Sequence, residues 1–141
     1  MEFLVYRSRA LVAPISPECE AILASSLRNN ARTGITGFLH AEPGIFVQYI
    51  EGPERFLWAL YDTLLADPRH TEVTLLGTAP IRERLFPEWR MGFAGPTIAS
   101  FLDFLAEATQ TGLPEKATAR ETIAFLYGAS QRVDLGLNRP L

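Results

Sequence analysis

The chain has 141 residues, of which 48% are hydrophobic and 21% are charged, which is typical of a globular domain and excludes a disordered or fibrous chain. Its 13 Lys and Arg residues against 16 Asp and Glu residues give a net charge of -3. No general positive field therefore attracts a polyanion, and we do not expect nucleic acid as a partner. A chain of this length is long enough to close a hydrophobic core, and we expect one folding unit with an appendage.

The sequence predicts neither a membrane span nor an exported protein. Its longest uncharged stretch, residues 91–102, contains Gly and Pro and is shorter than the roughly 20 apolar residues that a membrane helix needs. The first residues, MEFLVYRSR, contain no apolar run of the kind that an export signal requires. We expect a cytoplasmic protein. The single cysteine, Cys19, allows no internal disulfide and is interpreted as a packing residue.

The first half of the chain alternates between strand and helix patterns. Residues 2–9 have the two-residue period of a strand, with Tyr6 and Ser8 on one face. Ser16 and Pro17 are a capping hydroxyl and a first-turn proline, and the helix that they begin carries an apolar stripe to Asn30. Residues 33–41 and 45–51 predict a hairpin in which Gln48 shares a face with its apolar neighbours.

The second half continues the same alternation. A helix is expected after Pro53 and ends near Asp67, because the residue before a proline is pushed out of helical geometry. Residues 71–78 predict a fourth strand. Alternation over Trp89, Met91 and Phe93 predicts a fifth strand with these three side chains on one side.

This order predicts an α+β, ferredoxin-like βαββαββ sheet with two helices on one face. From residue 97 onward the spacing changes to that of two helices, the first with a stripe that includes Leu102 and the second over residues 119–128. These helices are expected to cover the other sheet face. We therefore divide the chain into a domain of residues 1–95 and a helical extension of residues 96–141, with the last nine residues, from Val133, weakly structured.

Three polar side chains occupy positions where the pattern favours apolar ones: Tyr6, Asn30 and Gln48. A buried amide or phenol without partners costs about 1 to 3 kcal/mol, so each must find hydrogen bonds. The three residues bond one another or a ligand, or each satisfies loop backbone within an ordinary core. Periodicity alone does not distinguish these alternatives.

Five sequence blocks together resemble a known family. In chain order they are FLVYRSRA, RNNARTGITGFL, GIFVQYIEG, DPRH and FPEWRMGF. In their order and spacing they are similar to the BLUF domains, the blue-light sensors that use flavin, over about residues 1–95. Any one block alone would be a weak signal.

The resemblance implies a flavin held without a covalent bond between the two helices. FAD is the flavin that we expect, with FMN and riboflavin as alternatives. Tyr6 matches the photoactive tyrosine of the family, Gln48 its switching glutamine and Asn30 the asparagine at the polar edge of the ring system. Asn29, Asp67, Arg69 and His70 lie in the blocks near the flavin, and Trp89 and Met91 match residues that relay the light signal.

The chemistry of two residue types agrees with these implied roles. A phenol has an electron and a proton to give, so it is a suitable donor next to an excited flavin. A glutamine amide has one acceptor end and one donor end, so its rotation or tautomerisation exchanges what it presents to a ligand. Light is therefore expected to drive electron and proton transfer from Tyr6 and to rearrange the hydrogen bonds of Gln48.

Two other functions are alternatives to a light sensor. An acylphosphatase-like hydrolase on this fold would use Arg7 with Asn30, but the loop after the first strand has no glycine to cradle a phosphate. A regulatory module without photochemistry would use the same polar trio to bind another planar molecule. His40 and His70 lack further ligands for a metal, and His40 is interpreted as a sheet-edge residue. We expect a sensor that is not an enzyme, signals through its C-terminal helices to an effector protein and forms a homodimer or a larger oligomer.

Overall fold

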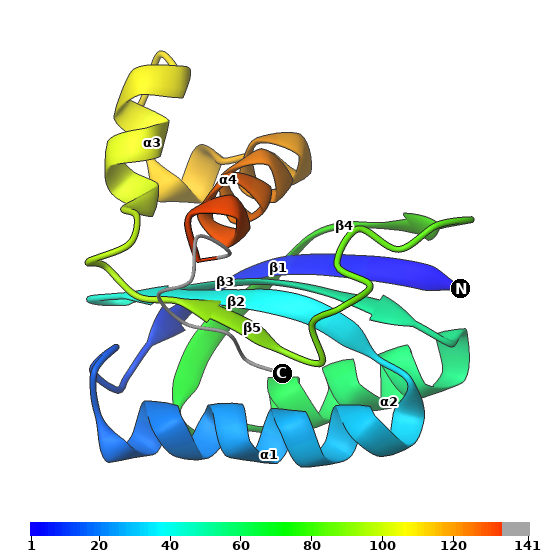
Figure 1. Ribbon diagram of the computed structural model, residues 1–141. Helices are drawn as coiled ribbons and strands as arrows, with labels where there is room; N and C mark the ends of the chain where they lie inside the picture. Colours follow the sequence, from blue (N-terminus) through cyan, green and yellow to red (C-terminus); the bar gives the residue numbers. More distant parts are fainter. Residues whose placement is uncertain (134–141) are drawn as a thin grey trace.

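The computed structural model describes residues 1–133 and shows a central sheet between two layers of helices (Figure 1). The order of elements confirms the predicted α+β, ferredoxin-like fold. In chain order the elements are β1 (Glu2–Ala10), α1 (Pro17–Thr33), β2 (Thr36–Glu42), β3 (Ile45–Gly52), α2 (Glu54–Leu65), β4 (His70–Pro80), β5 (Gly92–Ala94), α3 (Phe101–Ala108), the short 3-10 helix η1 (Pro114–Lys116) and α4 (Ala119–Val133).

The five strands lie in the order β4-β1-β3-β2-β5. Neighbouring strands are antiparallel, except that β5 pairs with β2 in parallel. The register places Tyr6 of β1 opposite Gln48 of β3, and Gln48 opposite Leu39 of β2. Since alternate side chains of a strand point to opposite faces, these three residues form a row across one face of the sheet.

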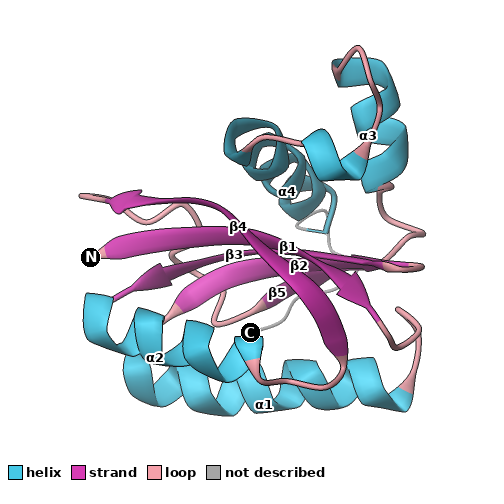
Figure 2. Ribbon diagram, turned by 180° about the vertical axis from the view of Figure 1, so that it is seen from behind, coloured by secondary structure: helices cyan, strands magenta, loops and turns pink. Residues whose placement is uncertain are grey.

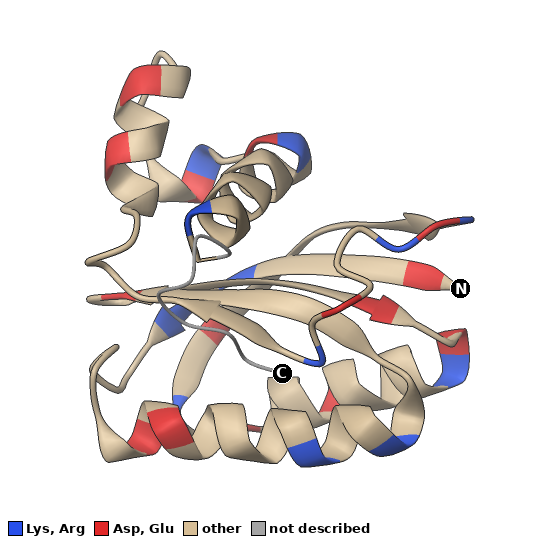
Figure 3. Ribbon diagram, viewed as in Figure 1, with Lys and Arg blue, Asp and Glu red and all other residues tan. Residues whose placement is uncertain are grey.

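Helix α1 begins and ends through local signals. The Ser16 side chain accepts a hydrogen bond from the Cys19 backbone N–H, and acids lie in the first turn and Arg32 in the last (Figure 3). Gly34, with φ at +76°, ends the helix in the left-handed conformation that glycine adopts readily. The predicted strand start at Thr33 is therefore wrong: Thr33 is the last helical residue, and β2 begins at Thr36.

Helices cover both faces of the sheet (Figure 2), and each face has its own hydrophobic core. The core under α1 and α2 includes Leu4, Tyr6, Ile50, Leu57 and Tyr61. The other core joins the sheet to α3 and α4, through residues that include Val5, Phe38, Phe101, Phe125 and Leu126. The predicted two-sided cover of the sheet is confirmed, because the C-terminal helices bury the face that α1 and α2 leave free.

The predicted fifth strand is too long, and its side chains do not share one side. Only Gly92–Ala94 pair with β2, while Trp89 and Met91 lie in the irregular connection before them. Trp89 packs in the core under α3 and α4, whereas Met91 and Phe93 pack on the α1 and α2 side. Strict alternation fails because the chain before Gly92 is not a strand.

His40 is not the sheet-edge residue that we expected. It lies on β2, between β3 and β5, and its side chain is fully buried. Its Nε2–H donates to Glu42 Oε1 at 2.7 Å. Its ring packs edge-on against the ring of Phe125, with 4.8 Å between the ring centroids. Because β5 adds a parallel strand outside β2, a position that is an edge in the hairpin becomes an interior position in the sheet.

Three further details of the helices differ from the predictions. Helix α2 ends at Leu65, two residues before the predicted end near Asp67. Leu102 is exposed although it belongs to the predicted apolar stripe, because α3 presents Phe101 and Leu105 to the core instead. Val133 is a buried residue of α4 rather than the start of a weakly structured tail; the rest of that tail, residues 134–141, lies outside the described residues.

Within residues 1–133, no helix has both the length and the apolar character needed to cross a membrane. The same part of the chain contains no group of three or more His, Cys, Asp or Glu residues placed to hold a metal ion.

Candidate functional site

A chain of hydrogen bonds joins three residues on the face of the sheet under α1 and α2. The Tyr6 hydroxyl donates to Gln48 Oε1 at 2.5 Å, and Gln48 Nε2 donates to Met91 Sδ at 3.2 Å. All three side chains are buried. The two ends of the Gln48 amide are thus used differently, one as an acceptor from a phenol and one as a donor to a thioether.

The environment of Tyr6 keeps its hydroxyl protonated. Burial raises the pKa of Tyr6 well above its ordinary value, and the nearby negative charge of Asp67 and the phenol of Tyr61 raise it further. The rings of Tyr61 and His70 approach that of Tyr6 edge-on, at 6.3 and 6.0 Å between centroids. Tyr6 is therefore a neutral phenol whose proton is held in one hydrogen bond.

Tyr6 and Gln48 line a cavity between the sheet and the two helices. Its walls combine apolar and polar side chains, namely Tyr6, Ile22, Ser26, Leu39, Phe46, Gln48, Leu64, Asp67, Arg69 and His70. Five of the nine residues that the sequence predicted for the site or its relay thus line this cavity, and Met91 is joined to them through its bond with Gln48. A larger cleft, of about 440 Å³, lies between α3 and α4 and shares no residue with this cavity.

Asp67, Arg69 and His70 follow the end of α2 and form the rim of the cavity. Asp67 accepts hydrogen bonds from the Arg69 guanidinium at 2.7 and 2.9 Å and from its backbone N–H at 2.9 Å. These bonds to Arg69 lower the pKa of Asp67 although partial burial opposes the change. The carboxylate and the guanidinium are therefore both charged at the mouth of the cavity.

His70 is held in one orientation by two bonds. Its Nε2 lies 2.6 Å from the carbonyl oxygen of Leu64, which only accepts, so Nε2 carries a hydrogen. In the neutral ring Nδ1 is then the acceptor for the Ser8 hydroxyl, 2.7 Å away. Ser8 was missed as a site residue, although its position two residues after Tyr6 on the same strand face was a usable signal.

Asn30 and Asn29 lie further along α1, away from the first cavity. Asn30 is buried and its Nδ2 donates to the Arg90 backbone carbonyl at 2.5 Å. Asn29 is exposed, and its Oδ1 accepts a hydrogen bond from Arg32. Both asparagines line a second hollow between α1 and α2, which Leu60 borders from α2. The two hollows lie between the same pair of helices.

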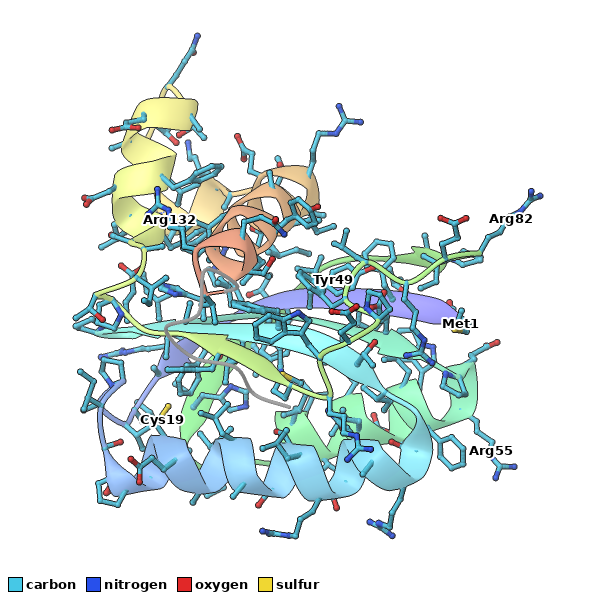
Figure 4. The ribbon with its side chains drawn as sticks, in the orientation of Figure 1. Met1, Cys19, Tyr49, Arg55, Arg82 and Arg132 are labelled. Atoms are coloured by element: carbon cyan, nitrogen blue, oxygen red, sulfur yellow. The ribbon has the colours of Figure 1, made fainter. Side chains whose placement is uncertain are left out.

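Trp89 and Cys19 lie apart from the Tyr6 and Gln48 pair. The Trp89 ring packs edge-on against Phe38 at 5.4 Å on the opposite face of the sheet, and a side chain at Gly92 would collide with both rings. Cys19 lies between α1 and the sheet (Figure 4), and burial raises the pKa of its thiol. It is the buried packing residue that we expected.

This geometry defines an α+β domain with a cavity between two helices, suited to a planar ligand with a polar edge. Residues 1–92 match the family described as BLUF, sensors of blue-light using FAD. The chain therefore belongs to the BLUF family, which confirms the resemblance that the five sequence blocks indicated. Members of this family bind flavin, so the expected class of cofactor is confirmed as well.

Relatives and solved structures agree with this assignment. The chain is 40% identical over 89 residues to photoactivated adenylate cyclase subunit beta of Euglena gracilis, an alignment that covers 62% of this chain but 10% of that protein. The dark-state structure of the BLUF protein BlrB is 31% identical, with a TM-score of 0.74, and covers 94% of this chain and 96% of its own. The photo-activated state of BlsA is 25% identical, with a TM-score of 0.76 and coverage of 92% and 94%.

The residues around the two hollows fit a flavin. An isoalloxazine ring is flat and largely apolar and has hydrogen-bonding groups along one edge, and the first cavity offers apolar walls beside the Gln48 amide. That cavity measures about 20 Å³, so a ring of this size requires the side chains that line it to rearrange. Gln48 and Asn30 are buried amides that border the first and the second hollow respectively.

Proposed function

We propose that this protein is a blue-light photoreceptor in which Tyr6 is the electron and proton donor and Gln48 is the switch. The observation that carries the proposal is the bond from the Tyr6 hydroxyl to Gln48 Oε1, with Met91 as the second partner of the amide. Asn29, Asn30, Asp67, Arg69 and His70 are proposed to bind the flavin, and FAD is the form that we propose.

When bound, the flavin supplies absorption of blue light and an excited state that accepts an electron. Tyr6 is the buried phenol that faces the cavity, and its raised pKa keeps a proton available on the hydroxyl in the dark. Because the hydroxyl already donates to Gln48, loss of that proton removes the donor that holds the amide in its dark orientation. The electron and the proton return to Tyr6 once the amide has rearranged, so the red-shifted state differs from the dark state in its hydrogen bonds.

Gln48 converts this change into a structural one. In the dark arrangement its oxygen faces Tyr6 and its nitrogen faces Met91. Rotation or tautomerisation of the amide replaces the donor toward Met91 with an acceptor or an imine group. Since a thioether is at best a weak acceptor and donates nothing, rotation removes the bond from Gln48 to Met91, and tautomerisation leaves only the single hydrogen of the imine nitrogen to make it.

The signal is proposed to leave through the connection that contains Met91 and Trp89. Met91 contacts Gln48 on one side of the sheet, while Trp89 packs in the core that holds α3 and α4 on the other. Movement of this short segment therefore changes packing on both faces. We propose that α3 and α4 transmit the change to an effector protein, that the chain forms a homodimer or larger oligomer, and that it is cytoplasmic.

The hydrolase alternative is not supported by the positions of its two residues. Arg7 lies on the opposite face of β1 from Tyr6, and its Nη1 donates to the Pro114 carbonyl at 2.6 Å. Asn30 is on α1, on the other side of the sheet. An arginine and an asparagine therefore do not converge on one phosphate.

An absorption spectrum of the purified protein before and after blue light tests the proposal. We expect the structured spectrum of bound flavin, a small reversible red shift on illumination and a return in the dark. Release of the flavin by denaturation, followed by chromatography, identifies it as FAD, FMN or riboflavin. A colourless protein that takes up no added flavin would contradict the proposed function, and a flavin-loaded protein without the shift would contradict the proposed switch.

A further inference from the structure

Glu51 is a buried carboxylate outside the flavin site, and its two oxygens accept hydrogen bonds from four donors. It is fully inaccessible to solvent. Its Oε1 accepts from the Leu85 backbone N–H at 2.7 Å and from the Tyr49 hydroxyl at 3.3 Å. Its Oε2 accepts from the Phe86 backbone N–H at 2.7 Å and from the Thr36 hydroxyl at 3.0 Å. Tyr49 marks this region of the sheet in Figure 4.

The two backbone donors belong to the irregular connection that carries Trp89 and Met91. This segment, residues 84–91, has no strand or helix hydrogen bonds of its own. Beyond the Glu51 carboxylate it is attached at four points. The Arg84 guanidinium donates to the Thr36 hydroxyl at 2.9 Å and to the Glu51 backbone carbonyl at 3.4 Å, the Gly37 N–H donates to the Trp89 carbonyl at 2.9 Å, Asn30 donates to the Arg90 carbonyl, and Gln48 donates to Met91 Sδ. One end of the segment is thus held by the Glu51 carboxylate together with Arg84, and the other end by the Gly37 backbone and by the Asn30 and Gln48 amides proposed for flavin binding and switching.

Glu51 and Gln48 are carried by the same strand, three residues apart, and point to opposite faces of the sheet. A sheet strand is rigid compared with an irregular connection, so the distance between the two attachments is set by β3. A carboxylate that accepts two backbone N–H bonds in a buried place is a strong attachment, because charge-assisted bonds are roughly twice as strong as neutral ones.

We propose that Glu51 is a positioning residue of the photosensor, the fixed attachment against which Gln48 moves Met91. This inference rests on the proposed function. With the Leu85 end held, a change at Gln48 displaces the Met91 and Trp89 end alone. Without the bonds from Leu85 and Phe86 to Glu51, the whole segment moves together with Gln48. Rearrangement of Gln48 is then faster both on illumination and on return to the dark state.

The test is Glu51→Gln in the flavin-loaded protein. An amide in place of the carboxylate presents an N–H₂ group to one of the two backbone N–H donors, which is then left unpaired. An unpaired buried N–H weakens the attachment of the segment to β3. We therefore expect dark recovery to be faster by about threefold or more, with unchanged flavin content. In a Trp58→Phe background Trp89 is the only tryptophan, and its fluorescence is expected to change as the segment is released.

Glu54→Gln is the matched control, because Glu54 is an exposed acid at the start of α2 that loses the same charge without contacting the segment. It is expected to recover at the wild-type rate. Recovery less than about threefold faster in Glu51→Gln, with wild-type Trp89 fluorescence, overturns the inference. If Glu51→Gln does not fold, Glu51→Asp keeps the charge but shortens the side chain, so the carboxylate no longer reaches both backbone N–H groups; faster recovery there supports the inference and an unchanged rate overturns it.

Failure of the proposed function is recognised separately. If the wild type binds no flavin or shows no red shift, the photoreceptor proposal fails before Glu51 is considered. The positioning role is then judged in the chain itself, by hydrogen exchange at the Leu85 and Phe86 amides. Faster exchange at these two amides in Glu51→Gln than in Glu54→Gln supports the role, and equal exchange refutes it.

Discussion

Tyr6 lies directly opposite Gln48 across the β1–β3 ladder, and its hydroxyl donates to the glutamine oxygen at 2.5 Å. Two central strands of the sheet therefore fix the donor and the switch relative to each other. Met91, the other partner of Gln48, lies on an irregular connection. The Gln48 amide thus bonds one partner on a rigid strand, Tyr6, and one partner on a segment that is able to move, Met91.

The first prediction is that Tyr6→Phe keeps the flavin and loses the light-induced red shift. The substitution removes the hydroxyl that donates to Gln48 and hardly alters the packing volume. Flavin content and difference spectra of the purified variant are the measurement. Tyr61→Phe is the control, since Tyr61 borders Tyr6 without bonding Gln48, and it should keep the shift. A normal, reversible shift in Tyr6→Phe would refute the donor role.

The second prediction is that Gln48→Leu also abolishes the red shift while the flavin stays bound. Leucine fills a similar volume but has neither the acceptor for Tyr6 nor the donor for Met91. The same difference spectra measure the effect, and Gln110→Leu, at an exposed position after α3, is the control. If Gln48→Leu switched reversibly with the wild-type spectrum, the switch would have to be sought elsewhere.

The third prediction is that Asn30→Ala weakens flavin retention. Without the buried Asn30 amide, polar groups on the edge of the flavin are left unpaired, at a cost of about 1 to 3 kcal/mol, or several-fold to a hundredfold in affinity. Flavin titration measures this. Asn29→Ala is expected to have the smaller effect, because Asn29 is exposed and already bonded to Arg32. Equal affinities for wild type and Asn30→Ala would remove Asn30 from the site.

The fourth prediction concerns the route of the signal. Light should change hydrogen exchange at amides between residues 97 and 128 in the wild type, because Trp89 packs in the core beneath α3 and α4. In Met91→Ala the red shift should persist while this change in exchange is lost, since Gln48 no longer has a partner on the connection. Identical exchange in the dark and in the light in the wild type would rule out this route.

The fifth prediction concerns acid stability. Burial alone would raise the pKa of Glu42, but hydrogen bonds from His40 and from the Phe101 backbone N–H at the start of α3 outweigh it and lower the pKa below its ordinary value of 4.5. A carboxyl with a lowered pKa in the folded state stabilises the fold above 4.5, and this contribution is lost as the pH falls through the folded-state pKa.

Denaturant unfolding at several pH values measures that contribution. Glu42→Gln should be less stable than the wild type near pH 7, and the difference in the free energy of unfolding should shrink as the pH falls below about 4.5. Glu115→Gln, on an exposed acid of η1, serves as the control for a lost surface charge. A difference that stays constant over this range would show that Glu42 does not stabilise the fold through its charge.

Local patterns predicted most of the elements and the central pair of the site. The alternation of β1 and β3 placed Tyr6 and Gln48 on the face where they meet, and the helical stripe placed Asn30 in the interior, because side-chain direction follows directly from the period of a strand or helix. The same reasoning failed at Trp89 and Met91. Alternation applies only within a strand, and the residues before Gly92 form an irregular connection.

The sequence by itself determined the order of strands and helices, the faces of Tyr6 and Gln48, and the resemblance to the BLUF family. Tertiary structure alone decided the burial of His40, the separation of Trp89 from Met91 and the four bonds to Glu51. Each of these depends on which segment, distant in the chain, covers a given position. Local periodicity describes the direction of a side chain from its own backbone, whereas its partners are set by long-range pairing and packing.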